Sequence, residues 1–376
     1  MSAAQRIEGD ILTPDGFIRG VLSHRDGHIA RIEGVPLPDA EAIDDAHGLV
    51  LPGFIDTHVH GGGGRDTMEG FEAIDTIARL HVRHGTTSLL AATMTAPLPE
   101  LESAMAGLGP SCRTRAARAA RVLGVHLEGP YINPDKLGAQ PNFVRPASVA
   151  EVLRLHALAP IRLITLAPEL PGNLDIIESL RAAGFQVQIG HTLGSYEEGV
   201  AALERGAGGF THLFNAMSGM HHRTPGIVGA ALAHARYAEI IPDMLHVHPG
   251  ALRAALRAIP CLFCVTDSTA GAGMPDGEYR LGRHRVIKCM GGVRLPDGTL
   301  AGSTLTMDQA LRNLVALGLS IRDASLRVST HAADYLGLAD RGRLTVGAHA
   351  DIVVLDPVLQ LTRVIVEGDE VDLADA

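Results

Sequence analysis

The sequence lacks any apolar run approaching the roughly 20 residues that a helix needs to span a bilayer. Its first residues carry charges where a signal peptide has an apolar core, and no small-residue cleavage pattern follows them. A formal net charge of −10 gives the chain no general attraction to nucleic acid or to an anionic membrane surface. We therefore expect a cytoplasmic protein whose partner is neither a membrane nor a nucleic acid.

Cysteine and lysine are also scarce. Of the four cysteines, Cys261 and Cys264 form a CxxC within the apolar run CLFCV, and no second cysteine pair accompanies them. A buried strand is therefore expected there in place of a zinc ribbon. The only lysines are Lys136 and Lys288, and the other positive charges are arginine. This scarcity limits the kinds of metal centre that the chain can build.

Both ends of the chain read as short strands joined by tight turns. The run FIRGVLSHRDGHIARIEG alternates apolar positions around an Asp26-Gly27 turn signal. The last stretch, from GRLTVGAHADIVVLD onward, also consists of short apolar runs, which are separated by glycines. Neither end has enough apolar surface to form a core alone. We therefore expect residues 1–49 and 340–376 to form one small β-sandwich domain, which the chain leaves and re-enters.

The middle of the chain, residues 50–339, has a different sequence pattern. Short apolar runs alternate with alanine- and leucine-rich helical stretches, which is typical of βα units around a parallel sheet. Eight runs are predicted to be strands, at residues 53–57, 87–93, 121–127, 162–167, 186–190, 209–211, 237–242 and 262–266. This number favours an α/β fold with a (β/α)8 TIM barrel as the catalytic domain, and an open doubly wound sheet is the alternative.

Metal-capable side chains stand at the ends of five predicted strands. The first strand ends in DTHVH, and because alternate residues of an extended segment point to the same side, His58 and His60 can both reach one ion. The other four strands end at Glu128, His191, His212 and Asp267. Each residue alone has a structural explanation, such as a capped turn or a surface loop. Their shared position at the active-site face of a barrel predicts a metal centre.

The predicted ligands suit hydrolytic chemistry. Neutral imidazoles with one carboxylate are typical of Zn²⁺ or a similar divalent ion, which can lower the pKa of a bound water to about 7. Asp267, beside that water, could take its proton and later deliver it to a leaving nitrogen. Many two-metal barrel hydrolases bridge their ions with a carboxylated lysine on the fourth strand. Here that strand ends in LAPE with no lysine near, so Glu128 is the expected shared ligand.

Longer motifs resemble a known family. LPGFIDTHVHGGGG and ADIVVLD are similar to segments of the amidohydrolase superfamily. HLEGPYINPDKLGAQPNFV, IGHT, THLFNAMSGMHHRTPG, LHVHPGAL, VTDSTAGAG and LAGSTLTM resemble the N-acetylglucosamine-6-phosphate deacetylases, over essentially the whole chain. The resemblance implies hydrolysis of N-acetyl-D-glucosamine 6-phosphate to D-glucosamine 6-phosphate and acetate. The alternatives are another N-acyl sugar phosphate, such as the galactosamine epimer, and a non-catalytic metal- or sugar-phosphate-binding protein.

The resemblance also implies roles for metal-binding and catalytic residues. Glu128, His191 and His212 match the principal metal ligands of the family. His58 and His60 match a pair that is present in two-metal members, so this chain could hold one or two divalent ions, with Zn²⁺ the expected metal. Asp267 matches the catalytic acid and base. His246 matches a histidine that contacts the substrate and polarises the acetyl carbonyl.

The remaining matches concern the amino-sugar phosphate. Asn215 and Ala216 match residues that hold the phosphate, and Arg223 matches an arginine that reaches it from the neighbouring subunit of a homodimer. The fork of a guanidinium suits a phosphate dianion. Many family members have a histidine where this chain has Gln140, which can donate a hydrogen bond but cannot carry a charge. Gln140 is therefore an expected substrate contact whose effect on sugar preference is left open.

Overall fold

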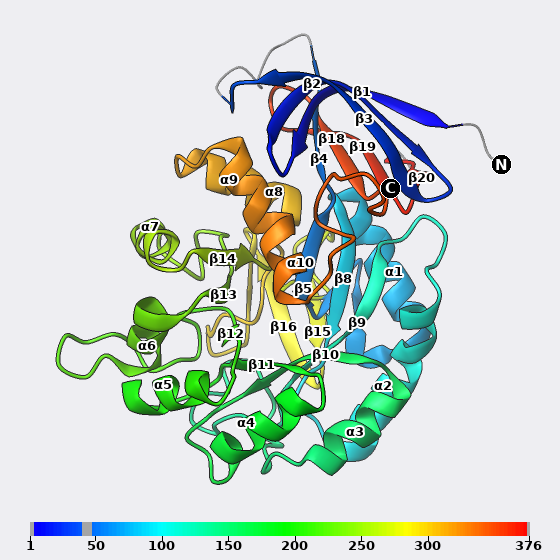
Figure 1. Ribbon diagram of the computed structural model, residues 1–376. Helices are drawn as coiled ribbons and strands as arrows, with labels where there is room; N and C mark the ends of the chain where they lie inside the picture. Colours follow the sequence, from blue (N-terminus) through cyan, green and yellow to red (C-terminus); the bar gives the residue numbers. More distant parts are fainter. Residues whose placement is uncertain (1–3, 40–46, 374–376) are drawn as a thin grey trace.

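The computed structural model describes residues 4–39 and 47–373. Figure 1 shows a sheet built from both ends of the chain lying over a ring of alternating strands and helices. Within the described ranges, none of the helices combines the length and apolar character that crossing a bilayer requires.

Parallel strands form the centre of the ring. Six of them pair in the order β12-β11-β10-β9-β8-β5, and β13 pairs with β14. The eight strands are β5 (Phe54–Val59), β8 (Thr86–Ala92), β9 (Arg121–Glu128), β10 (Ile161–Leu166), β11 (Gln186–Ile189), β12 (Gly209–Phe210), β13 (Tyr237–Ile240) and β14 (Cys261–Cys264). Each overlaps one of the eight predicted runs, so that prediction is confirmed. β14 also confirms the strand expected at the CxxC.

Backbone hydrogen bonds join the two groups of parallel strands. The N–H of Leu213, just after β12, donates to the carbonyl of Glu239 on β13 at 2.8 Å. On the other side, the N–H of Asp267, after β14, donates to the carbonyl of His58 on β5 at 2.9 Å. The sheet therefore curls back on itself as a barrel-like ring, which excludes the open doubly wound alternative.

Helices cover the outside of this ring (Figure 1). They are α1 (Phe71–Arg83), α2 (Leu98–Arg113), α3 (Val149–Leu158), α4 (Asn173–Ala182), α5 (Tyr196–Glu204), α6 (Gly226–His234), α7 (Pro249–Ala258), α8 (Met307–Ala316), α9 (Ile321–Ser325) and α10 (His331–Tyr335). Local sequence explains the start of α5, because the Ser195 hydroxyl caps this helix and Glu198 completes a capping box. Their apolar stripes face the strands, as Ile74 and Ile77 of α1 do.

The two chain ends pair in one seven-stranded sheet of order β20-β19-β18-β4-β1-β2-β3. Its strands are β1 (Gln5–Thr13), β2 (Gly16–Arg25), β3 (His28–Leu37), β4 (Leu49–Pro52), β18 (Ile352–Leu355), β19 (Leu361–Val366) and β20 (Asp369–Val371). Asp26 and Gly27 link β2 to β3 with φ of 49° and 81°, the positive values that a type I′ turn requires. The expected pairing of the ends is thus confirmed, whereas a separate β-sandwich domain stays a prediction.

A small antiparallel sheet follows β14 and was not predicted from the sequence. It consists of β15 (Gly277–Leu281), β16 (His284–Cys289) and β17 (Gly292–Arg294). Its buried residues Leu281, Val286 and Val293 pack with Met94 in a cluster apart from the main core. Leu281 and Met94 also line the cavity described next, so this sheet forms part of the wall of the site.

Candidate active site

A cavity of about 340 Å³ opens at the carboxyl ends of the barrel strands. The predicted site residues in its lining are His60, Glu128, Gln140, His191, His212, Asn215, Ala216, His246 and Asp267. His58 lies beneath the lining and is fully buried, while Arg223 is exposed and lies outside this cavity. The structure thus brings together all the predicted site residues except Arg223.

One group of ligand-capable atoms gathers around Glu128, the last residue of β9. Its Oε1 lies 3.1 Å from Nε2 of His191 and 3.0 Å from Nε2 of His212. The two Nε2 atoms are 3.1 Å apart. Nδ1 of His191 donates to the carbonyl of Lys136 at 2.8 Å, which leaves the lone pair of this imidazole on Nε2.

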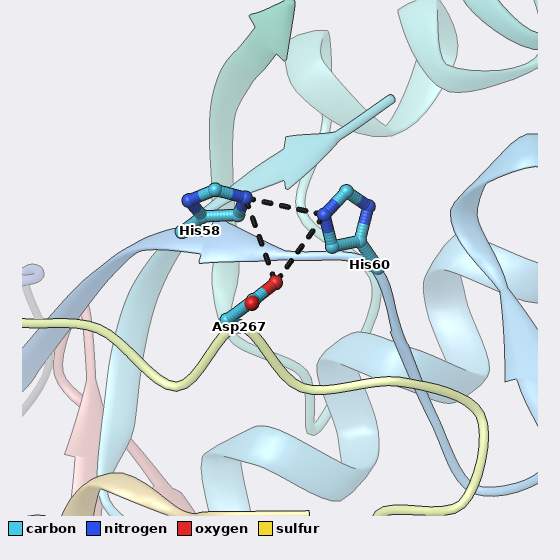
Figure 2. A group of neighbouring side chains, drawn as sticks. All are labelled: His58, His60 and Asp267. Carbon is cyan, nitrogen blue, oxygen red and sulfur yellow. Dashed lines mark hydrogen bonds and ion pairs between the residues drawn. The ribbon is translucent and has the colours of Figure 1, made fainter. Parts of the chain in front are cut away.

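A second group contains His58, His60 and Asp267 (Figure 2). The Nε2 atoms of the two imidazoles face each other at 3.1 Å, and Oδ1 of Asp267 lies 3.6 Å from His58 and 3.4 Å from His60. Glu128 touches this group as well, since its Oε2 is 3.0 Å from Nε2 of His60. Glu128 therefore lies between the two groups, where a shared ligand was predicted.

These donor atoms fit divalent metal ions. In both groups the atoms lie within 4.8 Å of one another. Lone pairs of imidazole nitrogens that face each other at about 3 Å repel unless a proton or a cation lies between them, and a carboxylate adds the balancing negative charge. Nitrogen and carboxylate oxygen together are the ligand set of zinc and similar ions. The first group offers Glu128, His191 and His212, and the second offers His58, His60 and Asp267.

The backbone turns several of these side chains into the cavity. His191, His212 and Asp267 each follow a barrel strand and have φ of 49°, 29° and 50°. This left-handed region costs an L-residue about 1 kcal/mol or more and is concentrated at functional sites. Backbone hydrogen bonds hold it in place, such as that from Asp267 N to the His58 carbonyl. Strand-end strain thus accompanies three of the candidate ligands.

Burial and charge set the ionisation of the site. Burial opposes ionisation of Glu128, but the imidazoles of His58 and His191 outweigh it and hold the pKa of this carboxyl well below its ordinary value. Burial lowers the pKa of His126 to about 3, with the neighbouring His58 acting in the same direction. His126 is therefore neutral, and its two nitrogens contact the Thr57 carbonyl and the Thr165 hydroxyl.

His246 enters the cavity from the loop after β13. Its Nδ1 lies 2.6 Å from Oδ2 of Asp243, whose Oδ1 accepts the backbone N–H groups of Leu245 and His246. Burial opposes protonation of His246, but Asp243 outweighs it and raises the pKa of the imidazole. The carboxylate thus orients the imidazole and favours its protonated form, in which Nε2 is a hydrogen-bond donor as well.

Two residues predicted to bind substrate have protein partners. Nε2 of Gln140 donates to Oε2 of Glu128 at 2.5 Å, and the backbone N–H of Thr95 donates to Oε1 of Gln140 at 2.6 Å. The side-chain amide of Asn215 donates to the carbonyl of His212 at 3.1 Å. Both residues line the cavity, so contact with a substrate stays a prediction for each.

Sequence reasoning missed Glu239, which lies on β13 beneath the cavity. Its carboxylate is fully buried and contacts the side chains of Thr57 and His58. Burial opposes its ionisation, but the hydrogen bond from His58 outweighs it and lowers the pKa of Glu239. The signal was present in the sequence, because Glu239 is a lone charge inside the apolar run YAEII.

Residues 49–372 match the Amidohydrolase family, so the chain belongs to this family of hydrolases. The family membership, together with the histidine and carboxylate groups at the strand ends, makes the protein a metal-dependent hydrolase of amide bonds.

The curated relatives are deacetylases of amino-sugar phosphates, a narrower group among such hydrolases. The chain is 39% identical to the N-acetylgalactosamine-6-phosphate deacetylase of Escherichia coli O157:H7, covering 95% of this chain and 96% of that protein. It is 36% identical to the N-acetylglucosamine-6-phosphate deacetylase of Lysinibacillus sphaericus, and the match covers 92% of this chain and 91% of that protein. Among solved structures, the chain is similar to a mutant of the N-acetyl-D-glucosamine-6-phosphate deacetylase of Mycobacterium smegmatis in complex with N-acetyl-D-glucosamine-6-phosphate. The TM-score is 0.90 at 33% identity, and the match covers 98% of this chain and 100% of that chain. The chain is thus a member of the N-acetylglucosamine-6-phosphate deacetylase family.

Proposed function

We propose that the protein hydrolyses the acetamide of N-acetyl-D-glucosamine 6-phosphate to D-glucosamine 6-phosphate and acetate. One observation carries this proposal: Glu128 lies between two groups of imidazoles, and Asp267 lies at the same cavity. The full-length relatives named above supply the substrate class.

The metal ligands in this proposal are those of the two groups. Glu128, His191 and His212 would hold a divalent ion, with Zn²⁺ as the proposed metal, and His58 with His60 would hold a second. A divalent ion in such a site supplies Lewis-acid polarisation and makes water acidic enough to deprotonate at neutral pH. The short Nε2–Nε2 distances in both groups support this assignment.

Asp267 and His246 are proposed to act on the substrate. The Asp267 carboxylate removes a proton from the attacking water as its oxygen bonds to the acetyl carbon. His246 donates a hydrogen bond to the carbonyl oxygen, where negative charge develops. Asp267 then transfers its proton to the amine nitrogen as the C–N bond breaks, which releases acetate and the amino sugar phosphate. The pairing of His246 with Asp243 supports the role of donor.

The phosphate is proposed to lie at Asn215 and Ala216, with Arg223 supplied by the second subunit of a homodimer. Arg223 is exposed and contributes nothing to the cavity of its own chain, which supports a role in a neighbouring one. Replacing Arg223 by Ala removes charge-assisted hydrogen bonds of about 1.5–3 kcal/mol, so KM for phosphorylated substrates should rise about 10- to 100-fold. KM for unphosphorylated analogues should stay unchanged. The control is Arg253→Ala, which replaces an exposed arginine of α7 and should leave KM unchanged for both kinds of substrate.

A second candidate substrate is N-acetyl-D-galactosamine 6-phosphate. The relative from E. coli named above, at 39% identity, is a deacetylase of this epimer and specifically favours the alternative. Gln140 at the cavity, where many family members have a histidine, is a further reason to test both sugars.

The deciding experiment is acetate release from four substrates: N-acetylglucosamine and N-acetylgalactosamine, each with and without the 6-phosphate. The protein is used with its metal content measured by elemental analysis. We expect the highest kcat/KM for N-acetylglucosamine 6-phosphate. A tenfold preference for the galactosamine epimer would select the second candidate. Binding of sugar phosphate without acetate release would refute the reaction and favour a non-catalytic binder.

We also propose that residues 1–49 and 340–376 act as a small β-sandwich domain beside a catalytic domain at 50–339, and that the protein works in the cytoplasm. The sheet of the two chain ends supports the first part, because it encloses its own apolar cluster, separate from the main core. That cluster contains Ile7, Ile11, Leu22, Ile29, Val50, Leu344, Ala348, Ala350, Ile352, Val354 and Ile365.

A further inference from the structure

Glu239 lies in the wall of the barrel with both carboxylate oxygens engaged. The Thr57 hydroxyl donates to Oε1 at 2.7 Å, and Nδ1 of His58 donates to Oε2 at 3.1 Å. The backbone N–H of His212 makes a longer contact of 3.4 Å with Oε2. The partners come from β5 and from the end of β12, so this one carboxylate joins strands on both sides of β13.

The mechanism proposed above does not explain a charge at this place. Glu239 is 0% exposed and does not line the cavity, so it cannot touch the substrate. Burying a carboxylate costs free energy that an apolar side chain in the same strand would avoid. The presence of this carboxylate in an otherwise apolar strand therefore points to a task for which the charge itself is needed.

The partner of Glu239 indicates that task. Because a carboxylate oxygen only accepts hydrogen bonds, the single proton of the neutral, metal-binding form of His58 stays on Nδ1, and in that form the lone pair of Nε2 faces His60 and Asp267. The Nδ1 atoms of His60 and His212 have no hydrogen-bond partner among residues 4–39 and 47–373, and that of His191 is held by a neutral carbonyl. Among the four candidate imidazole ligands, His58 alone is oriented by a carboxylate.

His126 offers an alternative explanation for the buried charge, since it lies with His58 and Glu239 in a third group of ligand-capable atoms. Both nitrogens of His126 are already engaged, one with the Thr57 carbonyl at 3.1 Å and one with the Thr165 hydroxyl at 2.7 Å. The nitrogen that His58 turns toward Glu239 carries a proton. This third group therefore offers no free imidazole lone pair to a metal ion.

We propose that Glu239 is a positioning residue that prepares His58 to bind a divalent ion at the group of His58, His60 and Asp267. The inference rests on the proposed function only in that a divalent ion binds there. Glu239 fixes the tautomer and the ring orientation of His58, and its negative charge makes Nε2 a stronger donor to a cation. Loss of such a carboxylate partner costs about 10- to 100-fold in metal affinity.

The test is titration of the chelator-treated full-length protein with Co²⁺ alone, followed by calorimetry and by the visible absorption of the bound ion. His60→Asn identifies the binding event that belongs to the His58 group. Glu239→Leu removes the acceptor, and Glu239→Gln keeps an uncharged acceptor of nearly the same shape. Asp308→Asn is the matched control, because Asp308, on α8, also pairs with a histidine, His84 at 3.3 Å, but is not part of the cavity lining.

We expect Glu239→Leu to weaken binding at the His58 group about 10- to 100-fold and Glu239→Gln to fall between this variant and the unmodified protein. Binding at Glu128, His191 and His212 should change less than about threefold in both, which also reports that the strands are intact. Asp308→Asn should leave both binding events unchanged.

Three results would overturn the inference: uptake of only one ion by the unmodified protein, unchanged affinity at both groups in the Glu239 variants, or an equal loss at both groups. These results are distinct from failure of the proposed function. A protein that binds two Co²⁺ ions in the expected order but releases no acetate would refute the reaction and leave the role of Glu239 standing.

Discussion

Replacing Glu367 by Gln should destabilise the attachment of the terminal sheet to the barrel. Glu367 lies in the turn between β19 and β20, where Arg115, Arg121 and Arg341 converge on it. Arg121 is the first residue of β9, and its guanidinium donates to both oxygens of Glu367, at 2.8 and 2.7 Å. One carboxylate thus links the C-terminal strands to the base of the barrel.

The magnitude follows from the ionisation of this carboxyl. Burial opposes ionisation, but the hydrogen bonds from Arg121 and Arg341 outweigh it and lower the pKa of Glu367 from 4.5 to about 2. That difference corresponds to at most about 3 kcal/mol at neutral pH, and solvent screening of this half-buried carboxylate reduces the expected stabilisation to about 1–2 kcal/mol. Because the pKa is lower in the folded protein, the contribution is complete above about pH 4.5 and is lost as the pH falls toward 2.

The assay is the free energy of unfolding in urea for the unmodified protein and for Glu367→Gln, between pH 7 and pH 3. We expect a difference of about 1–2 kcal/mol at pH 7 that shrinks below pH 4.5. Glu370→Gln is the control, since Glu370 pairs with Arg363 at the exposed end of the same strands and should cost less than about 1 kcal/mol. A loss in Glu367→Gln that equals the control, or that does not change with pH, would refute this reasoning.

Three further outcomes concern catalysis. Asp267→Asn should lower turnover about 10²- to 10⁴-fold while the ion at Glu128, His191 and His212 is retained by elemental analysis, and turnover within tenfold of the unmodified protein would remove Asp267 from the mechanism. Asp243→Asn should lower kcat for acetate release about tenfold through the loss of orientation of His246, with KM little changed; a rise in KM alone would instead assign the pair to substrate binding. Exhaustive chelation should abolish acetate release and Zn²⁺ should restore it, so full activity in metal-free protein would contradict metal dependence.

The strands and their functional ends were predictable from the sequence because both depend on local patterns. Apolar runs of three to seven residues bounded by turn residues predicted each barrel strand, and the predicted ends differ from the observed ones by at most two residues. The histidines and carboxylates that follow those runs could be grouped without coordinates, since the carboxyl ends of parallel strands in a barrel meet at one face.

Other features depend on contacts between distant segments. Glu239 and His58 are 181 residues apart, and nothing in either local sequence shows that their side chains meet. Likewise, the amide of Gln140 donates to Glu128 across the loop after β9, a contact that the local sequence does not indicate. The β15–β17 sheet was missed because its strands are short and each buries only one or two residues, so that their apolar alternation is weak.

The order of strands in the terminal sheet has a consequence for how the protein is made. β4 lies between β1 and β18, and Pro52 pairs with Ile352, about 300 residues later in the chain. On the ribosome, every helix of the ring emerges before β18 can complete that edge. Until then the apolar β4 presents unpaired backbone groups, which are a template for aggregation. Truncations that remove β18 to β20 should therefore lower the yield of native protein even though they leave the catalytic residues in place.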